Sequence, residues 1–148
     1  MLVGFDHVTV VVTDLDDGRA FFRALGFEEQ GSVLVSGGEM SRYMGIDGWV
    51  ADHVTLVHPD TTGHLEVQLL RFHHPELPAD RTPADLARLG LNHVCFEVTD
   101  LDDALAVLAS HGITARNDIL EFRDRRLVFL NGPDGVVVEL SQVQKPTT

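Results

Sequence analysis

The chain has a single cysteine, few basic residues and no long apolar run. The lone Cys95 excludes an intrachain disulfide, and the first residues have neither the basic nor the apolar segment of a secretory signal. No stretch reaches the roughly 18 apolar residues that a membrane-spanning helix needs. We therefore expect a cytoplasmic protein without a membrane partner.

Acidic residues outnumber basic ones. The 11 Lys and Arg residues against 23 Asp and Glu give a formal net charge of −12. Because the acidic residues are spread along the chain, its field repels phosphate backbones and anionic lipids on average, which argues against nucleic acid and membrane surfaces as partners. With 148 residues, of which 44% are hydrophobic, the chain is long enough for one domain with a substantial core.

Residues 5–27 and 91–113 form an internal repeat. FDHVTVVVTDLDDGRAFFRALGF aligns with LNHVCFEVTDLDDALAVLASHGI at an offset of 86 residues without a gap, and ten of the 23 positions are identical. Each copy begins with a stretch rich in Val, Thr and Phe, which is typical of a strand, and then changes to helical spacing. Each copy is therefore predicted to begin with a strand followed by a helix.

The run Asp-Leu-Asp-Asp in each copy predicts where the helix begins. Asp14 and Asp100 are expected to cap the helix amides, and the following acidic pairs favour the positive first turn. Gly26 and Gly112 stand where a left-handed helix terminus is expected. This explanation accounts for the acidic runs better than calcium binding does.

Three further strands follow each helix in the sequence pattern. They are expected around residues 33–34, 53–57 and 65–70 in the first copy, and near 119–122, 127–130 and 136–140 in the second. We predict a single α+β domain with modules 1–72 and 88–144 joined by a linker at 73–87. The loop-rich stretch 36–63 makes the first copy longer, and we expect it to form a lid.

Strand alternation predicts which side chains share a surface. In the opening strand of the first copy, three valines alternate with His7, so the valines should pack against the helices. His7 then lies on the opposite, concave face, and the same reasoning places His93 there in the second copy. Two histidines at matching positions of a repeat are candidates for metal ligands.

The closing strands carry oxygen atoms on the corresponding face. Apolar residues alternate with Glu139 in the second copy, and with His64, Glu66 and Gln68 in the first. Two histidines with one or two carboxylate or amide groups suit an octahedral divalent metal ion that keeps positions for water or substrate.

Structural interpretations of these residues stay open. A single strand histidine is often a hydrogen-bonded structural residue. An unpaired buried carboxylate such as Glu139 costs free energy, which a salt bridge would offset as well as a metal ion would. The arginines available for such a bridge are Arg123, Arg125 and Arg126. The sequence shows no interpretable partner spacing for His53, His58, His64 and His111.

Three segments resemble the vicinal oxygen chelate superfamily, which includes glyoxalase I, methylmalonyl-CoA epimerase, extradiol dioxygenases and bleomycin resistance proteins. They are the module starts FDHVTVVVTDL and LNHVCFEVTDL and the closing GPDGVVVEL. The resemblance covers nearly the whole chain. It implies that each module is a βαβββ unit, that the two modules form a curved mixed sheet around a cavity, and that the first and last strands of each module hold a metal ion.

The resemblance further implies that His7, Gln68, His93 and Glu139 bind a divalent ion such as nickel, cobalt, manganese, iron or zinc. Gln68 fits better than Glu66, because QLLRFHHP has the frame of the family's closing strands and matches ELS at Glu139. Glu66 stays an alternative ligand or base. The set is most similar to that of methylmalonyl-CoA epimerases. With one carboxylate the ion keeps a net charge of about +1, and Glu139 is the first choice for a catalytic base.

This resemblance implies a lyase or isomerase that abstracts a proton next to a metal-chelated carbonyl of a small substrate, and a homodimer. Two alternatives stay open. In an iron-dependent extradiol-type dioxygenase Gln68 would be a spectator, but those members usually have four modules where this chain has two. An antibiotic-sequestering, bleomycin-resistance-like binding protein would not need the complete ligand set.

Overall fold

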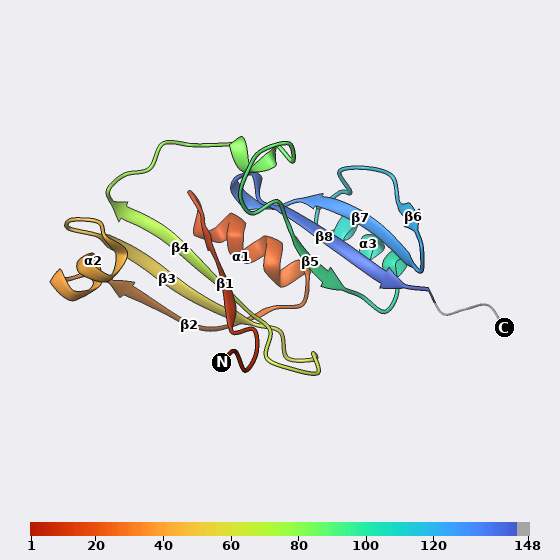
Figure 1. The fold of residues 1–148 in the computed structure, drawn as a ribbon, viewed down its shortest axis with the longest axis horizontal. Helices are drawn as coiled ribbons and strands as arrows, with labels where there is room; N and C mark the ends of the chain where they lie inside the picture. The colour runs from red at the N-terminus through yellow and green to blue at the C-terminus, as the bar shows by residue number, and fades with distance from the viewer. Residues whose placement is uncertain (145–148) are drawn as a thin grey trace. The chain divides into compact units, whose positions relative to one another are not determined.

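The structure is a computed structural model, and it describes residues 1–144. The chain divides between Ala79 and Asp80 into two compact units. Each unit contains a four-stranded mixed sheet with a ten-residue helix against it (Figure 1). This architecture confirms the predicted α+β fold of two βαβββ modules. Within the described part of the chain, no helix is long and apolar enough to cross a membrane.

The first unit places its opening strand beside its closing strand. Its sheet has the order β1-β4-β3-β2, in which β1 and β4 are parallel and the other neighbours are antiparallel. Its elements are β1 (His7–Val11), α1 (Leu15–Ala24), β2 (Glu28–Val35), α2 (Gly38–Met44), β3 (Val50–Val57) and β4 (Glu66–His74).

The second unit repeats this topology. Its sheet has the order β5-β8-β7-β6, with β5 parallel to β8. Its elements are the short helix η1 (Thr82–Ala84), β5 (Val94–Glu97), α3 (Leu101–Ser110), β6 (Leu120–Phe122), β7 (Arg125–Asn131), η2 (Pro133–Gly135) and β8 (Val137–Val143).

The predicted helix caps are confirmed. The Asp14 carboxylate accepts hydrogen bonds from two backbone amides of the first turn of α1, at 2.7 and 3.1 Å. The Asp100 carboxylate accepts one from the first turn of α3, at 3.0 Å. After the two helices, Gly26 and Gly112 have φ angles of 94° and 76°, which side chains disfavour.

One face of each sheet forms the core beneath its helix. In the first unit Gly18 of α1 lies so close to Leu69 of β4 that a Cβ there would stand 3.0 Å from the leucine. The largest fully buried strand residues of the two units are Val54, Leu56, Val67 and Leu69, then Val128, Leu130, Val137, Val138 and Leu140. Most of these residues alternate along their strands with half-buried polar residues. The polar side chains therefore lie on the opposite face of each sheet, where the candidate site is.

The stretch 36–63 is more ordered than predicted. It contains α2 and all of β3. Trp49 is buried at 2% exposure against Ala51 and Leu70, with Met40 and Met44 packed around them. Glycines at both ends of α2 hide this helix in the sequence, and tertiary packing holds it. At the end of the first module, β4 extends to His74, which is two residues into the predicted linker 73–87. There His74 pairs with Val50 of β3.

The matched glycines that follow the two helices give the first test. Gly112→Ala should lower the free energy of unfolding by about 1 kcal/mol through backbone strain. Gly26→Ala should cost more, because its Cβ would lie 2.7 Å from His58 Nε2, whose ring packs edge-on to Phe27. Urea denaturation followed by circular dichroism measures both. In a His58→Ala background the excess cost of Gly26→Ala should disappear, and equal costs in the wild-type background would contradict this account.

Candidate functional site

The predicted site residues lie on the open faces of the two sheets. We call His7, Thr9, His53, His64, Glu66 and Gln68 the first half-site, and Asn92, His93, Cys95 and Glu139 the second half-site. In the strand register Thr9 pairs with Gln68, and Cys95 pairs with Glu139. Because Thr9 and Cys95 occupy the same repeat position, Gln68 is the structural counterpart of Glu139, and Glu66 is not.

The second half-site brings two predicted ligands together. His93 Nε2 lies 3.6 Å from Glu139 Oε2, and the two side chains are 31% and 15% exposed. The His93 ring packs edge-on against Phe129, with 5.1 Å between the ring centres. The imidazole is therefore held by the sheet with one nitrogen facing the carboxylate.

Asn92 determines which nitrogen of His93 carries the proton. Its amide nitrogen donates to the Leu86 carbonyl at 2.7 Å, so its oxygen faces His93. This oxygen lies 2.7 Å from His93 Nδ1 and can only accept, so Nδ1 donates. In the neutral ring Nε2 is then a lone-pair atom directed toward Glu139.

His7 repeats the arrangement in the first half-site. Its Nδ1 lies 2.6 Å from Asp6 Oδ1, and Asp6 occupies the repeat position of Asn92. The hydrogen bond from His7 lowers the pKa of the Asp6 carboxyl. An oxygen partner on Nδ1 is the support that ligating histidines usually have, and it leaves Nε2 for a metal ion. The sequence analysis missed both supporting residues, although each precedes a histidine at matching positions of the repeat.

This geometry fits a metal ion. In the neutral ring, a histidine lone pair and a carboxylate oxygen face each other at 3.6 Å, and both atoms are of the kind that bind a metal ion. Neighbouring ligands of an ion with bonds of about 2.1 Å stand about 3 Å apart, so a small movement would close the pair on an ion. Among residues 1–144, no three or more His, Cys, Asp or Glu side chains cluster as a metal site. Each half-site by itself contains two of the four predicted ligands.

The arginines proposed as partners of Glu139 interact elsewhere. Arg125 donates to Ser141 Oγ at 2.9 Å and lies 3.5 Å from a carboxylate oxygen of Glu97. Arg126 pairs with Asp102 at 2.8 Å, and Arg123 lies over the Phe122 ring. The salt bridges of Arg125 and Arg126 therefore do not neutralise Glu139.

Thr9 and Cys95 occupy equivalent places beside the predicted ligands. The Thr9 hydroxyl donates to Gln68 Oε1 at 3.3 Å. Loss of hydration first, and then the neighbouring Glu139 carboxylate, raise the pKa of the Cys95 thiol to about 12. Cys95 therefore carries its proton at neutral pH, and its thiol, which donates to the Phe96 carbonyl at 4.0 Å, lies beside Glu139 as Thr9 lies beside Gln68.

The first half-site contains two histidines that the sequence analysis left unexplained. His53 Nε2 lies 3.0 Å from Gln68 Oε1, and Gln68 Nε2 donates to Glu66 Oε1 at 2.7 Å. His64 Nε2 lies 2.9 Å from Glu66 Oε2. Alternation already placed His64 on the face of Glu66, but His53 depends on the register of β3 against β4. His58 and His111 lie outside both half-sites, at the end of β3 and after α3.

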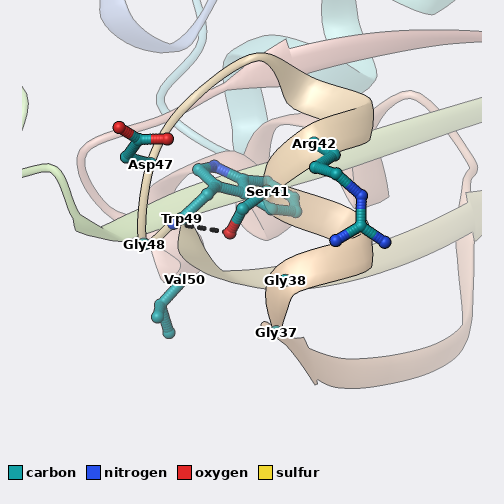
Figure 2. A pocket seen from close by; sticks show the side chains of 8 residues that line it. All are labelled: Gly37, Gly38, Ser41, Arg42, Asp47, Gly48, Trp49 and Val50. Atoms are coloured by element: carbon teal, nitrogen blue, oxygen red, sulfur yellow. Dashed lines mark hydrogen bonds between the residues drawn. The ribbon is translucent and has the colours of Figure 1, made fainter.

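A pocket of about 420 Å³ lies beside α2 in the first unit (Figure 2). Arg42 and Asp47 stand on opposite sides of it, and the Trp49 backbone amide donates to Ser41 Oγ at 3.1 Å. None of the predicted ligands lines this pocket. In the second unit a cavity of about 50 Å³ adjoins Asn92 and His93, which is room for water and not for a substrate.

The histidine tautomers can be tested without any metal. At a pH where the rings are neutral, nitrogen-15 NMR should find His7 and His93 protonated at Nδ1. His53 should be protonated at Nε2, because Gln68 turns its oxygen toward it. Asn92→Ala should mix the two tautomers of His93 and leave His7 unchanged. An Nε2-protonated His93 in the wild-type protein would contradict the assignment.

Comparisons with known proteins agree with this architecture. The chain is 29% identical over 136 residues to the uncharacterized protein YaeR of Escherichia coli (strain K12), which is 90% of this chain and 92% of YaeR. A glyoxalase family protein from Bacillus cereus has a TM-score of 0.86 at 29% identity, covering 98% of this chain and 97% of that one. A variant of the fosfomycin resistance protein FosX from Listeria monocytogenes, complexed with Mn(II) and 1S,2S-dihydroxypropylphosphonic acid, has a TM-score of 0.60 at 18% identity, covering 97% and 95%. This last similarity concerns the fold alone.

A family model gives the assignment. The model described as Glyoxalase/Bleomycin resistance protein/Dioxygenase superfamily matches residues 6–129, which is most of the chain. The match confirms the resemblance drawn from the two module starts. The chain belongs to the glyoxalase/bleomycin resistance protein/dioxygenase superfamily.

Proposed function

We propose that this protein is a divalent-metal-dependent enzyme of the glyoxalase and epimerase type. His7, Gln68, His93 and Glu139 are the proposed ligands of one ion. The observation that carries the proposal is His93 Nε2 facing Glu139 at 3.6 Å, with Nδ1 held by Asn92. Asp6 holds His7 in the same way, so the repeat prepares both histidines for a cation.

The donor set decides the chemistry. Two neutral histidines, a neutral amide and one carboxylate suit nickel, cobalt, manganese, iron or zinc. When bound, such an ion polarises the carbonyl of a substrate with adjacent oxygens. The Mn(II) in the FosX complex supports a divalent metal for a protein of this fold.

Glu139 is the proposed base. A carboxylate oxygen of its half-buried side chain accepts the proton from the carbon next to the substrate carbonyl and returns it. The salt bridges of the nearby Arg125 and Arg126 are to Glu97 and Asp102. The proposed reaction is therefore a lyase or isomerase reaction on a small substrate, by proton abstraction and return.

The partner and the compartment are proposals of the same kind. We propose a small molecule as the substrate, a homodimer as the assembly and the cytoplasm as the location. The strongly acidic chain supports a partner that is neither nucleic acid nor membrane.

Metal content tests the proposal. Untagged protein should contain or take up about one divalent ion per chain, measured by mass spectrometry after dialysis. His93→Ala should lose that ion, because the substitution removes one imidazole ligand and the neighbour that faces Glu139. His111→Ala is the matched control, since His111 lies after α3 and bonds to the Val107 carbonyl, and it should keep the ion.

The outcomes separate the candidate functions. One ion per chain together with solvent-proton exchange into a substrate with adjacent oxygens supports the proposal. Cleavage of catechol by the iron-loaded protein under air would favour a dioxygenase instead. Failure of the wild-type protein to bind nickel, cobalt, zinc, manganese or anaerobic iron would contradict both enzymes and favour a binding protein.

A further inference from the structure

The Gln68 side chain is held at both ends of its amide. Nε2 donates to Glu66 Oε1 at 2.7 Å, while Oε1 lies 3.0 Å from His53 Nε2 and accepts from Thr9 Oγ1 at 3.3 Å. A carboxylate can only accept hydrogen bonds, so Glu66 determines which end of the amide is nitrogen. The carbonyl oxygen must then face Thr9 and His53.

Glu66 is itself fixed and has both oxygens engaged. Oε1 accepts from Gln68, and Oε2 lies 2.9 Å from His64 Nε2. Its side chain is only 13% exposed. The Glu66 carboxylate is therefore held between Gln68 and His64.

An amide ligand needs such a neighbour, and a carboxylate ligand does not. Rotation by half a turn exchanges the nitrogen and the oxygen of an amide, and only the oxygen binds a cation, whereas the two oxygens of a carboxylate are equivalent. The repeat shows this difference. Glu66 begins β4 two residues before Gln68, and the residue two before Glu139, at the start of β8, is Val137.

We propose that Glu66 is a positioning residue that fixes the orientation of the Gln68 amide, so that its oxygen, and not its nitrogen, is the atom presented to the metal ion. This inference rests on the proposed metal site. It gives Glu66 an orienting role in place of the two roles that the sequence left open, alternative ligand and base. His64 holds the second oxygen of Glu66, and His53 holds the carbonyl side of the amide.

Glu66→Val tests the proposal, because it gives the first module the residue of the second. Affinity for nickel and manganese ions, measured by competition with a chelator, should fall at least about tenfold, the size expected when support for a ligand is lost. Glu66→Gln should keep most of the affinity, since its own carbonyl can accept from Gln68 Nε2. In a Gln68→Glu background, where the ligand has two equivalent oxygens, Glu66→Val should change the affinity much less.

Equal losses from Glu66→Val in both backgrounds would overturn the proposal, because a general effect of charge or structure would produce them. Loss of the ion in Glu66→Val but not in Gln68→Ala would make Glu66 the ligand and also overturn it. No binding by the wild-type protein would refute the metal site and this inference together. NMR of the metal-free protein tests the orienting contact apart from the metal site. Glu66→Val should let the Gln68 side-chain amide rotate and exchange its hydrogens faster. An unchanged amide signal would contradict the orienting contact.

Discussion

The parallel pairing of the opening and closing strands is the constraint on which each half-site depends. It sets Thr9 opposite Gln68 and Cys95 opposite Glu139, although each pair is separated by more than 40 residues of chain. With this register, the histidine at the module start and the oxygen donor of the last strand share one face. A shift of one residue would turn the donors into the apolar core, so packing of the valines and leucines keeps the polar site in place.

Polar contacts within each half-site follow from the same register. Asp6 and Asn92 precede the two histidines and fix their Nδ1 atoms. The two modules differ at the oxygen donor, because Glu139 is a carboxylate and Gln68 an amide. The additional hydrogen bonds of the first half-site, through His53, His64 and Glu66, accompany that difference. The oxygen-bearing side chains of the two half-sites thus occupy equivalent positions, but one is an amide and the other a carboxylate.

Much of the fold could be predicted because local chemistry marks it. The repeated strand and helix, the caps at Asp14 and Asp100, and the alternation along β1 and β8 are visible in the sequence, and so are the candidate ligands. The helix α2 was not visible, since glycines flank it and a cluster that includes Leu70 of the distant strand β4 stabilises it. His53 was missed for a related reason: its place beside Gln68 depends on the pairing of β3 with β4, which no local pattern reveals.

The central claim is that four side chains from two modules bind one ion. A crystal structure of the protein loaded with manganese, with the ion located by anomalous scattering, tests it most directly. The account predicts one peak within about 2.3 Å of Nε2 of both His7 and His93, of Gln68 Oε1 and of a Glu139 oxygen, whether the modules come from one chain or from two. An ion bound by His93 and Glu139 without His7 and Gln68, or bound through Glu66, would contradict it.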